Sequence, residues 1–248
     1  MTDKMKLGFK KDIHLEWMNH SLYLTIQGLK EKEIRKELDE YLALQVTESG
    51  EPFTLGARSY IKPLLAVWFK TNPVCAEFRD ALIAEAKKTN SSNWLPMHWA
   101  IMAVEYPLWY HVANQFGRLF SLQEVVRPSQ IYSRIKDLYG DTETVARNTR
   151  YIIATMSNWS LISKKDGKPG NYVKPSLINI TEQVFSLLCE SILRAKDESL
   201  LEEAIIHDKS LYSFNYNIGF ITSITRFSNN RVVSMQRGIG KSVLYVQE

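Results

Sequence analysis

Apolar residues recur at steps of three and four positions through most of the first half of the chain. This spacing places them on one face of an α-helix. It is clearest in Leu15, Met18, Leu22 and Ile26, in Ile34, Leu38, Tyr41 and Leu42, and in Ile61, Leu64, Leu65, Trp68 and Phe69. Turn-forming stretches separate these runs at Gly28, 48–52, Asn72-Pro73 and 89–93. The chain is therefore predicted to be helical almost throughout from Ile13 to Phe120, beginning with an α-helical bundle.

Two further helical patterns meet at a Gly140–Asp141 turn. In the first, Ile131, Ile135 and Leu138 share one face, and Gly140 can take the left-handed conformation that ends it. Asp141 or Thr142 can cap the second. Its apolar stripe consists of Val145, Ile152, Met156 and Trp159, with Thr149 filling a gap. These patterns predict two helices, 128–139 and 142–159.

Short strands are predicted on both sides of this helix pair. Val125 and Val126 indicate a strand within 121–127, and Leu161-Ile162 leads into another. The glycines and proline of 163–170 predict a turn, and 171–174 a returning strand. Strand, helix, turn, helix and hairpin in this order are typical of a winged helix-turn-helix, whose second helix enters the DNA major groove.

The last third is predicted to return to helix over 177–206 and over Leu211–Phe227. A β-hairpin follows, with strands Arg231–Arg237 and Ser242–Val246 around Gly238-Ile-Gly240. Because Arg226, Arg231, Arg237 and Lys241 face only one acid there, Glu248, this hairpin is a candidate second basic wing.

The predicted fold is therefore mainly α, in three domains. Residues 1–93 form a helical bundle and residues 94–175 a winged helix-turn-helix. Residues 176–248 form a C-terminal helical region that ends in a β-hairpin and is a candidate second winged helix. Trp94, Trp99 and Trp109 with nearby methionines fall at helical spacing and are interpreted as core.

Positive charge is concentrated in one segment. Residues 127–175 hold nine Lys or Arg and four acids, a net +5, whereas the whole chain is +4, so the remainder sums to −1. A local excess of this kind is the electrostatic signature of a nucleic-acid surface.

The residues expected to touch double-stranded DNA follow from this geometry. Thr144, Arg147 and Tyr151 lie on the outward face of the second helix and are candidates for the groove, with Asn148 at the edge of that face. Phosphate contacts are expected from Arg150, Lys164, Lys165, Lys168, Tyr172 and Lys174. Glu143 on the same face favours an alternative, in which the winged helix contacts protein.

No catalytic, metal or cofactor site is predicted. Gly240-Lys241-Ser242 ends like a phosphate-binding loop, but position 235 is Met where that motif needs Gly, and the following residues resemble a strand. Asp80, Glu85 and Lys87 could hold Mg²⁺ in a nuclease, yet their helical pattern indicates a solvated face. Cys75 and Cys189 lack ligand spacing and are interpreted as core thiols.

The expected compartment is the cytoplasm. No apolar segment follows the basic N-terminus, which argues against a secretory signal. No run approaches the length of a membrane span, since Ile61–Phe69 is short and contains Lys62 and Pro63. No membrane partner is expected.

The layout of the first two thirds resembles the A-component proteins of bacterial BREX anti-phage defence systems. It is carried by the helical bundle, by Trp68-Phe69 before Asn72-Pro73, and by the helical region leading into Gly140-Asp141-Thr142. The resemblance implies a DNA-binding accessory subunit without an enzymatic site. The first hypothesis is thus a non-catalytic double-stranded-DNA-binding protein, either such a subunit in a defence or DNA-processing complex or a transcriptional regulator. The second is a winged-helix scaffold that docks on an ATPase or nuclease.

Overall fold

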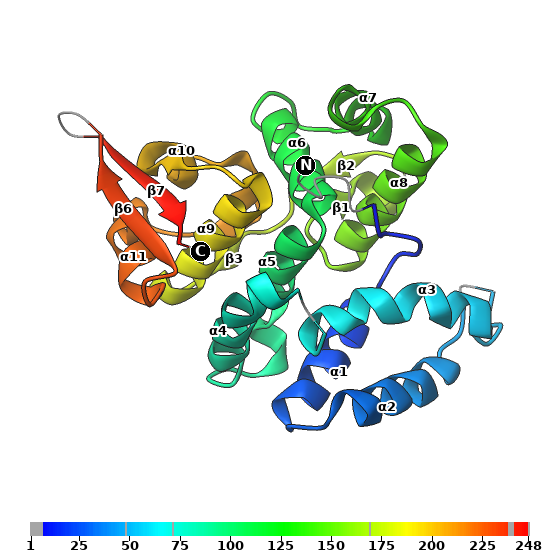
Figure 1. Ribbon diagram of the computed structural model, residues 1–248. Helices are drawn as coiled ribbons and strands as arrows, with labels where there is room; N and C mark the ends of the chain where they lie inside the picture. The colour runs from blue at the N-terminus through cyan, green and yellow to red at the C-terminus, as the bar shows by residue number, and fades with distance from the viewer. Residues whose placement is uncertain (1–6, 48, 71, 169, 238–240, 248) are drawn as a thin grey trace.

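A computed structural model describes residues 7–47, 49–70, 72–168, 170–237 and 241–247. Eleven α-helices dominate this part of the chain, so the prediction of a mainly α fold is confirmed. Three groups of elements surround a central pair, α5 (Leu95–Glu105) and α6 (Pro107–Phe120) (Figure 1). The first three helices lie at the lower right in that view, the helix pair that follows α6 at the upper right, and the C-terminal elements at the left.

The N-terminal group is helical, as the apolar spacing predicts. Its inward positions, such as Leu22, Ile34 and Leu64, are fully buried. Helix α3 continues through Pro63 and runs directly into a 3₁₀ turn. The elements are α1 (Leu15–Ile26), α2 (Glu31–Ala43), α3 (Leu55–Leu65), η1 (Ala66–Trp68), η2 (Pro73–Cys75), α4 (Ala76–Ala86) and η3 (Ser91–Asn93).

The helix pair after α6 is also present, as α7 (Pro128–Tyr139) and α8 (Glu143–Asn158). Ile131 and Ile135 of α7 are buried, but Leu138 is 54% exposed, so its predicted inward orientation is wrong. Tyr139 instead packs against the core from the last turn and lies edge-on to His111 of α6.

A small antiparallel ladder accompanies this pair. Strand β1 (Ser163–Lys164) pairs with β2 (Tyr172–Val173), with η4 (Lys165–Gly167) between them. The predicted first strand is reduced to one bridge, Val126 with Tyr172, so β2 lies between Val126 and β1. Pro169, part of the predicted turn, lies outside the described residues.

The C-terminal group differs most from the sequence prediction. Only part of 177–206 is helical, and the helix predicted over Leu211–Phe227 is wrong: its segment contains β5 and two short helical stretches. The elements are β3 (Ile178–Asn179), α9 (Glu182–Lys196), β4 (Leu200–Leu201), α10 (Glu202–Ile206), η5 (Lys209–Leu211), β5 (Phe214–Asn215), η6 (Ile218–Thr222) and α11 (Ser223–Phe227). The predicted final hairpin is confirmed as β6 (Val232–Gln236) and β7 (Ser242–Val246); its residues 238–240 lie outside the described part.

Asp208 explains why the chain turns instead of continuing as helix. Its carboxylate accepts hydrogen bonds from Tyr110 and Asn114 of α6, at 2.8 and 3.1 Å, and from both the amide and the hydroxyl of Ser210. A Cβ at Gly117 would lie 1.7 Å from the Lys209 carbonyl oxygen, so only glycine permits this close approach to α6. Beyond this turn, β5 pairs in parallel with β3.

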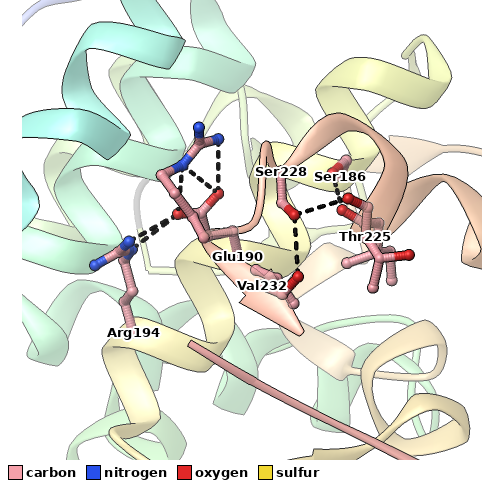
Figure 2. A network of polar contacts seen from close by, with 8 residues as sticks. Ser186, Glu190, Arg194, Thr225, Ser228 and Val232 are labelled. Atoms are coloured by element: carbon pink, nitrogen blue, oxygen red, sulfur yellow. Dashed lines mark hydrogen bonds and ion pairs between the residues drawn. The ribbon is translucent and has the colours of Figure 1, made fainter. Parts of the chain in front are cut away.

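A buried ion-pair cluster fastens the final hairpin to α9. The Glu190 carboxylate is fully buried and accepts from Arg194 at 2.8 Å and from Arg231, just before β6, at 3.0 Å. Beside it, the Ser228 hydroxyl contacts the carbonyl oxygens of Thr225 and Val232 (Figure 2). Arg231 also donates to the second oxygen of Glu190, at 3.0 Å, so both oxygens have a partner, which a buried carboxylate requires.

One buried histidine lies at the junction of the N-terminal group and α5. The Trp68 indole donates to Nδ1 of His98 at 3.1 Å, so Nε2 carries the proton and donates to Asn19 Oδ1 at 2.8 Å. Burial disfavours the charged ring and lowers the pKa of His98 to about 3.

Glu190→Gln is expected to lower the free energy of unfolding by about 3–5 kcal/mol, because it leaves two guanidinium groups, each only 10% exposed, without a carboxylate. Glu182→Gln on the same helix is the matched control. Its partner Arg226 is exposed, so the loss there is expected to stay below about 1 kcal/mol. Urea unfolding measures both, and equal losses would contradict this description of the cluster.

Stability is expected to fall with acidity because of His98. The pKa of His98 in the folded chain lies below its value in the unfolded chain. As the pH drops below about 6.5, this histidine is therefore protonated in the unfolded chain and stays neutral in the native chain. Between pH 7 and pH 5 this group alone removes about 2 kcal/mol from the free energy of unfolding. His98→Gln should flatten the pH dependence measured by urea unfolding, whereas the exposed His207→Gln should not; the same slope in both variants would refute the assignment.

Candidate nucleic-acid interface

The start of α8 is fixed by its own turn. Gly140 has φ +88° and ψ 160°, a backbone conformation that side chains disfavour, and nothing lies within 4 Å of where its Cβ would be. Thr142 then caps α8, its hydroxyl accepting from the Val145 amide at 3.2 Å. Lys136 and Asp141 pair across the turn at 2.6 Å, and this carboxylate raises the pKa of Lys136.

The inner face of α8 is buried as its apolar stripe predicts, with Val145, Thr149, Ile152, Met156 and Trp159 all inaccessible. The N-terminal segment before α1 holds this face in place. The Ile13 amide donates to the Thr155 hydroxyl, and the Trp159 indole donates to the Ile13 carbonyl, both at 3.1 Å. The orientation of α8 is thus set by contacts with the beginning of the chain.

The outer face of α8 is open, as predicted. Thr144, Arg147 and Arg150 are exposed, and Tyr151 is half-buried. Arg150 lies beside Tyr132 of α7; burial raises the pKa of this phenol, and the neighbouring guanidinium partly opposes that rise. The contact restrains Arg150, whereas no ion pair restrains Arg147 among the residues that the structure describes.

Asn148 does not belong to this outer face. Its side chain is only 2% exposed, and its amide donates to the Thr144 carbonyl at 2.8 Å. At 100° per residue, Asn148 lies about 60° from Val145 on the helix and so borders the buried stripe. Its predicted place among the groove contacts is therefore corrected to a contact within the helix.

The β1–β2 hairpin carries three exposed lysines, Lys164, Lys168 and Lys174. Lys165 is half-buried, and its ammonium lies 3.6 Å from Glu124. The three exposed lysines and the outward residues Thr144, Arg147 and Arg150 are called the basic face below.

Tyr172 is also misplaced by the sequence prediction. The side chain is 6% exposed and packs edge-on against Phe116 of α6, with ring centroids 6.1 Å apart. Its amide and carbonyl both pair with Val126, at 2.9 and 2.8 Å. The expected phosphate contact is corrected to a packing role, because the central strand of the ladder turns this ring inward.

Few of the cations in the segment 127–174 are neutralised. Within the described residues, Lys136 and Lys165 lie within 4.0 Å of a carboxylate, so seven of the nine have no such partner. Arg127 is one of the seven, is exposed, and follows the Val126 bridge directly. The sequence prediction did not include it as a contact, although its position after a strand beside the hairpin could have indicated one.

The residues considered for metal chemistry have other partners. Asp80 pairs with Arg79 at 2.7 Å, and buried Glu85 pairs with Lys88 at 2.7 Å. Among the described residues, no three His, Cys, Asp or Glu side chains are grouped so that they could hold a metal ion. Cys189 is buried as expected, whereas Cys75 is half-buried. Gly240 lies outside the described residues, and Ser242 begins a strand instead of the helix that a phosphate-binding loop needs.

No model of a protein family matches this sequence, no curated protein matches it, and no solved structure matches its fold. None of the helices in the described ranges combines the length and the apolar character that crossing a membrane requires. The geometry and charge of the basic face are therefore the features that indicate a function.

Gly140→Ala is expected to lower the free energy of unfolding by about 1–3 kcal/mol, because alanine is strained at this positive φ. Gly56→Ala in α3 is the control: its nearest neighbour is the Thr54 hydroxyl at 3.7 Å, an ordinary contact. That variant should be unchanged or gain up to about 1 kcal/mol. Thermal unfolding compares the two, and a neutral Gly140→Ala would contradict the proposed constraint on the turn.

Proposed function

We propose that this chain is a non-catalytic protein that binds double-stranded DNA, chiefly through the phosphate backbone. One observation carries the proposal: seven cations of the segment 127–174 have no carboxylate partner within 4.0 Å among the described residues, and most of them are exposed. Lysines and arginines that replace counterions along DNA supply most of the non-specific affinity for a duplex.

The arrangement of elements supports a winged helix-turn-helix. Helix α6, the Val126 bridge, helices α7 and α8, and the β1–β2 hairpin follow in that order. The hairpin closes into a ladder in which β2 is central. In such a unit the first turns of the second helix of the pair, here α8, enter the major groove, and the hairpin lies along the backbone.

The roles within the basic face differ. Thr144, Arg147 and Tyr151 are the groove candidates, because they lie on the open side of the early and middle turns of α8. Arg150, Lys164, Lys168 and Lys174 fit phosphates, and Lys165 would exchange Glu124 for one. With Asn148 buried, the groove set is small, and Glu143 at the helix start repels phosphate. We therefore propose modest sequence specificity.

We further propose that the protein is an accessory subunit of a bacterial anti-phage defence or DNA-processing complex, with a larger ATPase or nuclease as its partner. The resemblance in layout to the A-component proteins of BREX systems motivates this. One feature of the surface agrees with a protein contact: Leu44 and Leu55, at either end of the α2–α3 connection, are 82% and 72% exposed. The same feature favours the alternative of a winged-helix scaffold for protein contact, whereas a transcriptional regulator remains the alternative within DNA binding.

A salt titration of duplex affinity tests the proposal. The logarithm of the binding constant should fall linearly with the logarithm of the salt concentration. Lys164→Ala with Lys165→Ala should reduce the magnitude of the slope by about 1–2, because each lost phosphate contact removes about 0.9. Arg147→Ala should weaken binding by about 1–3 kcal/mol if it reaches a guanine, and less on duplexes without one at that position. Fluorescence anisotropy with labelled duplexes measures these quantities.

Lys136→Ala is the matched control, since this lysine of the same segment is already paired with Asp141. The salt dependence of duplex affinity in this variant should have the same slope as in the natural sequence. Undetectable affinity at low salt, or slopes unchanged by the loss of Lys164 and Lys165, would reject DNA binding through this face and leave the scaffold hypothesis in place.

A further inference from the structure

The C-terminal group repeats the order of elements around the basic face. The first unit is α6, the Val126 strand position, α7, α8, β1 and β2. The second is α9, β4, α10, α11, β6 and β7, with η5, β5 and η6 inserted between α10 and α11, so that the third helices begin 80 positions apart (143 and 223). In each unit the last strand lies in the middle of the sheet, flanked by the first strand and the second, and all pairs are antiparallel.

The spacing of the two units is also similar. The first helices begin 75 positions apart (107 and 182), and the second helices begin 74 apart (128 and 202). The second strands begin 69 apart (163 and 232), and the last strands 70 apart (172 and 242). One topology therefore occurs twice along the chain, with the final β6–β7 hairpin at the place of the β1–β2 hairpin.

The helices of the second unit are poor candidates for the groove. α11 has 5 residues, against 16 in α8. Its cation, Arg226, is paired with Glu182 of α9, and Arg231 after it is neutralised by the buried Glu190. Neither arginine is available to a phosphate without the loss of its carboxylate partner.

The two remaining cations of the second unit's hairpin are different. Arg237 and Lys241 are exposed, and neither has an ion pair within the part of the chain that the structure describes. The Arg237 amide donates to the Lys241 carbonyl at 2.8 Å, so the two residues face each other across the hairpin. Figure 1 shows this hairpin extending away from the helices of its own group.

We infer that the β6–β7 hairpin is a second DNA-contacting element, in which Arg237 and Lys241 bind duplex phosphates. The inference rests on the proposed function, because it assigns to this hairpin the role proposed for β1–β2. It supplies affinity without base reading, since α11 presents no unpaired cation. Figure 1 places the two hairpins on opposite sides of α5 and α6, so simultaneous contact requires a duplex long enough to reach both.

The test is a salt titration with duplexes of about 12 and about 35 base pairs, which span ~40 and ~120 Å at ~3.4 Å per base pair. A compact chain of this length has a radius of gyration of ~18 Å, and so a diameter of roughly 45 Å, so that only the longer duplex extends beyond the whole molecule. Arg237→Gln with Lys241→Gln should reduce the magnitude of the slope on the long duplex by up to about 1.8, twice the 0.9 of one contact. Affinity for the long duplex should fall by up to about sixtyfold at 0.1 M salt, to the same extent on every sequence. On the short duplex the double variant should match the natural sequence.

Lys32→Gln with Lys87→Gln, two exposed lysines of the bundle, is the matched pair and should change neither slope. If the natural chain binds and loss of Lys164 and Lys165 lowers the slope, but the hairpin variant does not, the second contact is refuted and the proposed function stands. If the natural chain binds neither duplex, both the second contact and the proposed function are refuted. Because the substituted side chains are exposed, apart from the half-buried Lys165, circular dichroism should show unchanged folding in each variant.

Discussion

Helix α5 is buried on nearly every side, and the arrangement of the whole molecule depends on covering it. Ten of its eleven residues are inaccessible, including Trp99, Ile101 and Met102. A helix that is apolar all round must be enclosed by other elements. Here α6, α9 and the N-terminal helices enclose it, and the core extends without a break through all three groups of elements. A displacement of any one group would expose apolar surface at about 25 cal/mol per Å².

This constraint determines where the charged residues can lie. Hydrogen bonds that join Thr155 and Trp159 to Ile13 hold α8 in one orientation on its inner side. Tyr172, packed on Phe116, holds the β1–β2 hairpin against α6. The ion pair between Glu190 and Arg231 holds the final hairpin against α9. The buried contacts are thus specific and rigid, whereas the exposed lysines and arginines stay outside them. Such preorganised cations lose little freedom on binding a polyanion, apart from that of their own side chains.

Much of this could be predicted from the sequence, since long amphipathic patterns determine helices reliably. The apolar stripe formed by Val145, Ile152 and Met156 identified both faces of α8. The glycines within 163–170 identified the hairpin. Three kinds of error remained. Asn148 borders the stripe, and a helical wheel does not show that its amide bonds to the backbone. Tyr172 was predicted to be a wing residue because it lies among the lysines of the hairpin. A one-residue bridge to distant Val126 turns its side chain inward, and the local sequence does not show that bridge. The segment 211–227 resembled a helix because the contacts that break it, Asp208 with α6 and β5 with β3, are made far away in the chain.

The sequence indicated a candidate second winged helix and its final hairpin, but not the order of strands in the sheet, because that order depends on the pairing of short strands far apart in the chain. The central claim is that exposed, unpaired cations on α8 and on the β1–β2 hairpin bind duplex DNA. Lysine acetylation read by mass spectrometry, with and without a saturating duplex at low salt, tests it most directly. The account predicts that DNA protects Lys164, Lys168 and Lys174 and leaves Lys32, Lys36 and Lys87 reactive. Equal reactivity of both sets in the presence of DNA, or protection confined to the bundle lysines, would contradict it.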